Sequence, residues 1–273
     1  MIVRPRIVEC IATASLRRVT LLLAPAGSGK SVALQQYLAI LEDSAKRFDD
    51  GRAFLTWSAE CLASFSGTIA LDGLERYDAE SLREIVASIE NANRAIRWII
   101  ASRSAIGIPV GTWLAYRECD LPIAAPELAF THDELSEAAR ESALTTDSGE
   151  LRELLAAIDG WPAAVPVALQ VLAKSNDRRE AYAAIRDASD RFWLEQVYGQ
   201  LDDEERQFFA VAAALPLIDV KVLERAGFGN ALQLADDLRL RTGLLHDEGD
   251  GIYRCPELFL EFLRRRTAFE NAR

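Results

Sequence analysis

The sequence predicts an α/β fold, with a parallel sheet in the first half of the chain and helices in the second. Over roughly the first 125 residues, short apolar runs of strand length alternate with segments of helical periodicity, which is the pattern of βαβ units. A glycine-rich turn at residues 24–31 joins the first such strand to the first long helix. After about residue 125, helical segments follow one another, and a short β-hairpin is expected near the end.

The composition is that of an ordinary globular protein. The chain has 273 residues, and 50% of them are hydrophobic, so that it corresponds to about two domains at roughly 150 residues each. It carries 31 Lys and Arg against 42 Asp and Glu, for a net charge of −11. Because phosphate groups repel such a chain, we expect neither nonspecific binding to nucleic acid nor docking on an anionic membrane.

The cysteines indicate a reducing compartment. The four of them (Cys10, Cys61, Cys119 and Cys255) are far apart and form no CxxC pair, which is typical of free thiols and excludes a zinc ribbon. The first residues are too few and too charged for a secretory signal, and no apolar run reaches the ~18 residues of a membrane span. We therefore expect a cytoplasmic location.

The elements of the first half are expected from their local patterns. Continuous apolar runs predict strands buried on both faces, and apolar residues at helical spacing predict helices. In chain order these are a short helix at 7–16, a strand at 19–23, a helix at 31–41, strands at 53–57 and 68–71, a helix at 80–91 and a strand at 98–101. The second and third strands are separated by fewer residues than a parallel crossover usually needs, so the second is expected at a sheet edge or with an irregular connection.

The second half is expected to begin with three helices. Thr131 and the glutamate three residues later form a capping box at the start of a helix over 131–144. Further helices are expected at 150–158 and 162–174, where Pro162 suits a first helical turn.

The last third of the chain has the order of a winged helix. Short helices follow residue 190, and residues 243–254 have the pattern of a small β-hairpin, the wing. The predicted fold class is thus α/β, a parallel sheet followed by a small helical domain and a winged-helix domain. The expected domains are 1–125, 126–189 and 190–273.

The most informative segment is the glycine-rich turn. From Ala24 to Ser31 it matches the phosphate-binding P-loop G-x-x-x-x-G-K-[ST], except that Ala24 replaces the first glycine. Gly27 and Gly29 let the backbone turn so that successive N–H groups point inward, and the following helix directs its positive end to the same point. Lys30 can reach the β- and γ-phosphates of a nucleotide, and the hydroxyl of Ser31 can bind Mg²⁺. A chance glycine-rich turn is disfavoured by the strand before it and the helix after it.

An acidic residue follows the third strand. Asp72 is the natural Walker B acid and would hold Mg²⁺ through water, since ligands gather at the carboxyl ends of parallel strands. A turn aspartate is the alternative interpretation. Many NTPases place a second acid next to it to activate water, but here that residue is Gly73, and the nearest acids are Glu75 and Asp78. Hydrolysis is therefore expected to be slow or absent.

Arg103 follows the fourth strand. A cation at that strand end can contact the γ-phosphate and report whether it is present, although an exposed surface arginine fits the sequence equally well. The expected catalytic residues are thus Lys30, Asp72 and Arg103, and the expected metal-binding residues are Ser31 and Asp72.

These features resemble the nucleotide-binding core of STAND-class P-loop ATPases, in particular the large LuxR-type transcriptional regulators typified by the maltose-regulon activator. The resemblance runs from about Arg4 to about Arg265. Its markers are Arg4-Pro5-Arg6, the loop 24–31, Trp57, Asp72, Ser102-Arg103 and the segments 128–131, 160–162 and 255–259. An Ala-Pro-Ala-Gly start of the loop is usual in that group, so Ala24 agrees with it.

The resemblance implies ATP or ADP with Mg²⁺ as the ligand. In that family an arginine-rich leader lies against the adenine, and a Gly-x-Pro motif of the small helical domain, here Gly160 and Pro162, also contacts the nucleotide. The cofactor-binding residues expected on this basis are Arg4, Pro5, Ala26, Gly27, Ser28, Gly29, Lys30, Ser31, Val32 and Pro162. A plainer interpretation of residues 160–162 is a joint between helices with Trp161 as a core anchor, and both can hold.

The chain also departs from the family. Gly73 stands where relatives have the second acid, and Cys255 stands where the family often has a histidine that in related switches touches the ADP phosphate. Relatives continue into a helical-repeat sensor and a DNA-binding helix-turn-helix, so this chain is expected to be a standalone core or a fragment.

The sequence therefore favours an ATP/ADP-binding molecular switch in transcriptional regulation or signal transduction, a slow ATPase at most. One alternative is a winged-helix DNA-binding regulator that uses the arginines near residues 239–241 and 264–266. Others are a metabolic P-loop enzyme such as a small-molecule kinase, and a degenerate nucleotide-binding module without turnover. Expected partners are the nucleotide and either a protein partner or missing C-terminal sensor and DNA-binding domains; a membrane or direct DNA contact is not expected.

Overall fold

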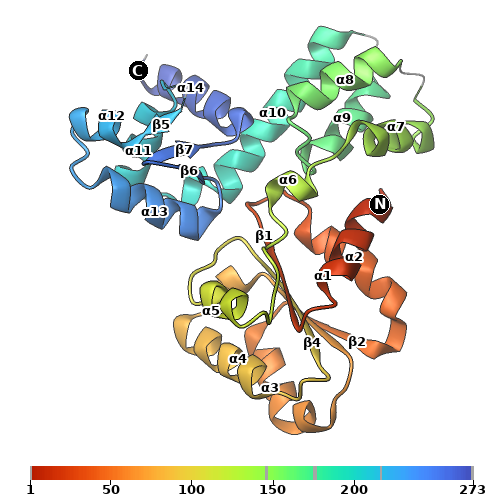
Figure 1. The fold of residues 1–273 in the computed structure, drawn as a ribbon. Coiled ribbons are helices and arrows are strands. Elements are labelled where there is room, and N and C mark those ends of the chain that lie inside the picture. Colours follow the sequence, from red (N-terminus) through yellow and green to blue (C-terminus); the bar gives the residue numbers. More distant parts are fainter. Residues whose placement is uncertain (1, 145–146, 175–176, 216, 272–273) are drawn as a thin grey trace. The chain divides into compact units, whose positions relative to one another are not determined.

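A four-stranded parallel sheet organises the first part of the chain in the computed structural model (Figure 1). The structure describes residues 2–144, 147–174, 177–215 and 217–271, and the chain divides into two units, Met1–Leu128 and Ala129–Arg273. The strands of the first unit lie in the order β1-β4-β3-β2. Their bounds are Val19–Leu23 for β1, Ala45–Phe48 for β2, Thr68–Asp72 for β3 and Arg97–Ser102 for β4. Because all four strands run in the same direction, their carboxyl ends lie along the same border of the sheet.

Helices cover both faces of this sheet. They are α1 (Pro5–Ala14), α2 (Lys30–Leu41), α3 (Gly51–Cys61), α4 (Ala79–Asn91), α5 (Val110–Ala115) and the short α6 (Ala125–Leu128), with 3₁₀ turns at Glu42–Ser44, Leu62–Ser64 and Leu74–Arg76. Neighbouring strand residues point to opposite faces: Leu22 packs in the core with α1 and α2, whereas Leu21 packs in the core with α3 and α4. β1, β3 and β4 are therefore mostly apolar, as parallel strands buried on both faces require, whereas β2 is partly exposed.

One predicted strand is wrong. Residues 53–57 lie inside α3, whose N-cap Asp50 accepts a hydrogen bond from the backbone N–H of Ala53 (2.8 Å). Within this helix Phe54 and Trp57 are three residues apart and lie on one face, where both contact the ring of Phe48. The second strand is instead β2, earlier in the chain, and it lies at the edge of the sheet beside β3. The crossover from β2 to β3 thus has room for a helix.

The second unit is mostly helical. Its helices are α7 (His132–Glu141), α8 (Ser148–Ala157), α9 (Ala164–Leu172), α10 (Arg178–Gln196), α11 (Asp203–Ala212), α12 (Val220–Arg225), α13 (Ala231–Thr242) and α14 (Glu257–Asn271), with a 3₁₀ turn at Tyr198–Gln200. Three short antiparallel strands in the order β5-β7-β6 complete it; their bounds are Ile218–Asp219 for β5, His246–Gly249 for β6 and Ile252–Arg254 for β7. The hairpin predicted at 243–254 is confirmed by β6 and β7.

The capping box at the start of the second unit is also confirmed. The N–H of Glu134 donates to Oγ1 of Thr131 (3.3 Å), and the N–H of Thr131 donates to Oε2 of Glu134 (3.0 Å). The first unit ends at Leu128, close to the predicted boundary after residue 125. The second predicted boundary, after residue 189, falls inside α10 and stays a prediction.

Candidate functional site

The P-loop lies between the carboxyl end of β1 and the start of α2. Its first residue is tied to the neighbouring strand, since the N–H of Ala24 donates to the carbonyl of Ser102 (3.3 Å). Gly27 and Gly29 have φ of 76° and 80°, the left-handed region that side chains disfavour, so the loop requires glycine at both positions. Gly29 is also the N-cap of α2 and offers no side-chain acceptor, which leaves the first turn of the helix suited to an anion.

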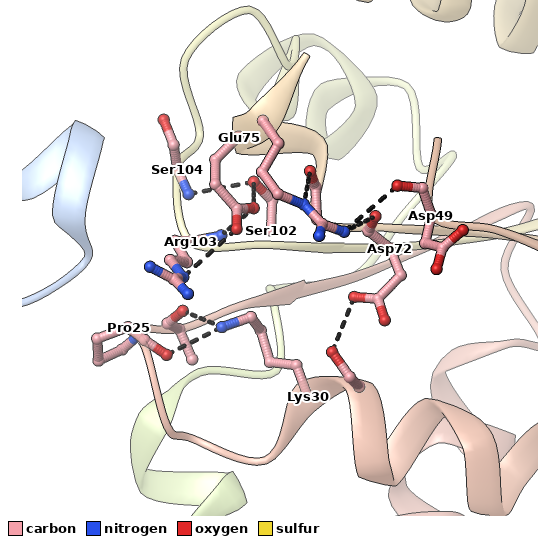
Figure 2. Close-up of polar contacts among 12 residues, drawn as sticks. Pro25, Lys30, Asp49, Asp72, Glu75, Ser102, Arg103 and Ser104 are labelled. Atoms are coloured by element: carbon pink, nitrogen blue, oxygen red, sulfur yellow. Dashed lines mark hydrogen bonds and ion pairs between the residues drawn. The ribbon is translucent and has the colours of Figure 1, made fainter. Parts of the chain in front are cut away.

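Lys30 points back into this loop (Figure 2). Its ammonium donates to the carbonyls of Ala24 (2.5 Å) and Pro25 (2.9 Å), and the residue is only 8% exposed. Burial lowers the pKa of Lys30 to about 8; the carboxylates of Glu75 and Asp72 counteract this shift, and the cation of Arg103 adds to it. A buried ammonium beside a glycine-rich loop and a helix N-terminus is suited to an anion such as phosphate.

Asp72 lies at the end of β3, almost fully buried, and both oxygens of its carboxylate are engaged. Oδ1 accepts a hydrogen bond from Oγ of Ser31 (3.1 Å; Figure 2), and Oδ2 accepts one from the guanidinium of Arg47 on β2 (2.7 Å). A hydroxyl and a carboxylate are oxygen ligands of the kind that Mg²⁺ prefers, and Mg²⁺ commonly takes its remaining ligands from waters and substrate phosphates. Ser31 and Asp72 therefore fit a nucleotide-bound Mg²⁺.

Glu75 belongs to this site. It lies in the 3₁₀ turn after β3, and its carboxylate reaches the end of β4, where Oε2 accepts from Oγ of Ser102 (3.2 Å) and from the N–H of Arg103 (3.0 Å; Figure 2). The guanidinium of Arg103 forms an ion pair with the same carboxylate (3.4 Å), so Arg103 lies at the site and not on an open surface. Asp78, the other nearby acid, instead caps α4 by accepting from the N–H groups of Glu80 and Ser81.

The conformation at Gly73 explains why no second acid follows Asp72. Its φ is +74°, and its N–H donates to the carbonyl of Ala101 (2.8 Å). A Cβ at this position would clash with the guanidinium of Arg76, which donates to the carbonyls of Asp72 (3.2 Å) and Asp49 (3.4 Å; Figure 2). The left-handed backbone therefore favours glycine here, and a side chain would also have to displace the guanidinium of Arg76.

The arginine-containing leader is fixed to the same unit. Arg4 is 5% exposed; its guanidinium donates to the carbonyl of Leu128 (2.8 Å), and its N–H donates to Oε1 of Gln36 on α2 (3.0 Å). The amide of Gln36 in turn donates to the carbonyl of Ile2 (2.6 Å), and Pro5 occupies the first turn of α1. The leader is thus bound to the helix that starts at the P-loop, while its contact with an adenine stays a prediction.

The other predicted ligand residues divide between the two units. In the loop, Ala26 and Ser28 are buried, whereas Val32 in the first turn of α2 is exposed. In the second unit, the carbonyl of Gly160 accepts from the N–H of Phe130 (2.8 Å), which supports the interpretation of residues 160–162 as a helix joint.

The next residue in that joint is a core anchor. Trp161 stacks on Trp193 with ring centroids 4.5 Å apart and contacts Phe192 edge to face at 4.8 Å. The nucleotide contact expected of Pro162 stays a prediction. Cys255 is buried, and burial, followed by the charge of Glu257, raises the pKa of its thiol, so it stays protonated and offers no cation to a phosphate.

Sequence reasoning missed two residues of the site and left a third open. Arg47 was missed because its strand was assigned elsewhere, and Gln36 because its partners are more than thirty residues away in the chain. The proximity of Glu75 to Asp72 in sequence was a signal, but the turn that directs it to Ser102 is visible only in the structure.

Comparison with known proteins shows the fold. No model of a known protein family matches the chain. The Walker-type ATPase of Pyrococcus abyssi has a TM-score of 0.71 at 13% identity, covering 97% of this chain and 96% of that one. A STAND-class signal transduction ATPase of Pyrococcus horikoshii with a tetratricopeptide repeat sensor has a TM-score of 0.46 at 15% identity. The superposition covers 97% of this chain and 42% of that one, and the TM-score is too low to show a shared fold. With the parallel sheet and the loop, the first similarity shows that this chain has a P-loop NTPase fold.

Several curated mycobacterial proteins are similar to the chain in sequence. The chain is 25% identical over 333 residues to the serine/threonine-protein kinase PknK of Mycobacterium tuberculosis and to that of Mycobacterium bovis. The alignments cover 97% of this chain but 29% of each relative, so the chain spans less than a third of their length. Within the described ranges, none of the helices has the length and hydropathy that a membrane span requires.

Proposed function

We propose that this chain is an ATP/ADP-binding molecular switch with slow or absent hydrolysis, and that it acts in transcriptional regulation or signal transduction. The observation that carries the proposal is the convergence of Lys30, Ser31 and Asp72 at the carboxyl edge of a parallel sheet. A glycine-rich loop and a helix N-terminus meet there with a buried ammonium, which together favour a polyphosphate. Ser31 and Asp72 offer the kind of oxygen ligands that a nucleotide-bound Mg²⁺ would use.

Slow turnover is supported by the surroundings of the Walker B acid. Gly73 cannot be replaced by an acid without displacing Arg76, and the carboxylate of Glu75 is engaged by Ser102 and Arg103. A carboxylate that already accepts from Ser102 and pairs with Arg103 is poorly placed to orient a water molecule. We expect hydrolysis below about 0.1 s⁻¹, well under the ~10 s⁻¹ typical of enzymes.

The regulatory role rests on the resemblance to LuxR-type regulators and on the order of elements in the second unit. Helices α11 to α13 are followed by the β6–β7 hairpin, the order of a winged helix. Cytoplasmic location is part of the same proposal, since the four cysteines are all free thiols. The kinase activity in the name of the mycobacterial relatives belongs to proteins more than three times as long, and it is not part of the proposal.

A direct DNA-binding role is disfavoured by the pairing of the arginines that would carry it. Each of four arginines in the two clusters forms an ion pair with an acid of the second unit: Arg239 with Asp236, Arg241 with Glu205, Arg264 with Glu257 and Arg265 with Asp190. Guanidiniums neutralised in this way attract phosphate weakly, and the net charge of −11 adds repulsion.

The nucleotide that copurifies with the chain tests the proposal. Protein purified without added nucleotide is denatured, and the released ligand is identified by ion-exchange chromatography; we expect ADP or ATP. If none is released, and calorimetry with ADP and with ATP gives no binding, the proposal fails. A gel-shift titration at low and moderate salt separates the DNA-binding alternative, which requires a shift that survives moderate salt.

A further inference from the structure

Arg47 reaches Asp72 because of the register of the sheet. β2 pairs with β3 in parallel, with Arg47 opposite Ala70, so the two side chains lie on the same face. Asp72, two residues beyond Ala70, lies on that face as well, which is the face of α2 and Ser31. The guanidinium of Arg47 contacts Oδ2 of Asp72 at 2.7 Å, and its side chain is 35% exposed.

This ion pair concerns the carboxylate oxygen that a metal would use. Each oxygen of this carboxylate accepts one hydrogen bond, Oδ1 from Ser31 and Oδ2 from Arg47, so a hydrated Mg²⁺ held by either oxygen would lie near the guanidinium. An arginine keeps its charge at any pH at which the protein is folded. Mg²⁺ at Asp72 would therefore lie beside a fixed positive charge. At a separation of about 4 Å and an effective dielectric constant of about 20, this repulsion would lower the affinity of the site for Mg²⁺ by more than tenfold.

We propose that Arg47 is a specificity-determining residue that makes nucleotide binding nearly independent of Mg²⁺. The guanidinium takes the place of the metal's charge at Asp72, and Lys30 supplies the cation in the phosphate loop. The preferred ligand is then a metal-free nucleoside diphosphate. This inference rests on the proposed nucleotide-binding function and concerns the form of the ligand.

Calorimetric titration with ADP tests it, once in EDTA and once in excess Mg²⁺. The quantity of interest is the ratio of the two dissociation constants, EDTA over Mg²⁺. We expect a ratio below three for the parent chain and a rise of at least threefold in Arg47→Gln, because the fixed positive charge beside Asp72 is then removed. Arg47→Lys keeps the charge and should keep the low ratio.

Lys46→Gln is the matched control. It removes the same charge from the adjacent position of β2, but Lys46 points to the opposite face, where its ammonium lies 5.8 Å from the centre of the Trp57 ring. Its ratio should equal that of the parent. Circular dichroism checks that each variant is folded. If Arg47→Gln does not fold, the inference is tested by the ratios of the parent and of Arg47→Lys, which should both be below three.

Two results would overturn the inference. One is a parent ratio of three or more, which means that Mg²⁺ strengthens binding despite Arg47. The other is a low ratio that persists in folded Arg47→Gln, which means that another feature excludes the metal. If the parent binds ADP in neither buffer, the proposed nucleotide-binding function itself has failed, and Arg47 with it.

Discussion

Lys30 is the residue on which phosphate binding should depend most. In Lys30→Ala the loop loses its buried charge, and we expect the affinity for both ADP and ATP to fall at least tenfold, about 1.4 kcal/mol. Calorimetry at pH 7 measures this. Lys221→Ala, which removes a lysine from α12 in the second unit, is the control and should bind as the parent does. Equal affinities in Lys30→Ala and the parent would show that the loop is not a phosphate site.

The lowered pKa of Lys30 also predicts a pH dependence. Without ligand the ammonium loses its proton near pH 8, whereas a bound phosphate stabilises the charged form and raises the pKa. Above pH 8, binding must therefore take up a proton, and ADP affinity should fall by up to about tenfold per pH unit. Calorimetry from pH 7 to pH 9.5 gives the profile. Lys30→Met, which binds weakly at every pH, should show a flat profile; a flat profile in the parent would contradict the prediction.

The lowered pKa of Lys30 also affects the stability of the ligand-free fold, which should rise with pH where ADP affinity falls. Between pH 8 and 10.5 the unfolded chain holds a proton on Lys30 that the folded, ligand-free chain does not. The contribution of Lys30 to the free energy of unfolding therefore rises with pH across that window. Burial of this cation is unfavourable at neutral pH, as is common where a site is arranged for a ligand.

At the scale of elements, the 3₁₀ turn after β3 decides which residues can follow Asp72. Gly73→Ala forces a side chain into the left-handed region and against Arg76, so the free energy of unfolding should fall by about 1–3 kcal/mol. Urea denaturation measures the change. Gly111→Ala in α5 is the control, because a Cβ there meets nothing within 4 Å and should leave stability unchanged or raised. Equal stabilities of the two variants would contradict this account of Gly73.

The elements also show where sequence reasoning succeeds and where it ends. β1, β3 and β4 could be predicted because they are buried on both faces and are therefore mostly apolar. β2 could not, because an edge strand with Lys46 and Arg47 has a polar pattern, while the apolar and aromatic run 53–57 resembles a strand although Asp50 caps it as a helix. The P-loop could be predicted from the local sequence pattern of residues 24–31. The partners of Asp72 and Glu75 could not, because they depend on which strands are neighbours in the sheet.

At the scale of the whole molecule, the switch proposal predicts different conformations with different nucleotides. A ligand shifts a conformational equilibrium only through its differential affinity for the states. Arg103, now paired with Glu75, can exchange that carboxylate for a γ-phosphate, so ATP offers a contact that ADP does not. Small-angle scattering with saturating ADP and with a non-hydrolysable ATP analogue should give distinguishable profiles.

Arg103→Ala tests the origin of that difference. The variant should bind ADP with nearly parental affinity, while the two scattering profiles should become alike. Arg97→Ala, at the other end of β4, removes the same charge far from the loop and should preserve the difference. Identical profiles in the parent would mean that this chain on its own is a static binding module.

The position of β2 has a consequence for the solubility of the protein. At the opposite edge of the sheet, β1 is covered, because the backbone of Leu23 donates to the carbonyl of Ile123 and that of Ile123 to Leu21. β2 is the outer strand at its own edge, and a strand there can pair with another chain unless its charges or its shortness prevent it. Four residues with Lys46 and Arg47 at the centre meet both conditions. Loss of both charges at once would therefore favour edge-to-edge aggregation, a hazard for any double variant of this strand at high concentration.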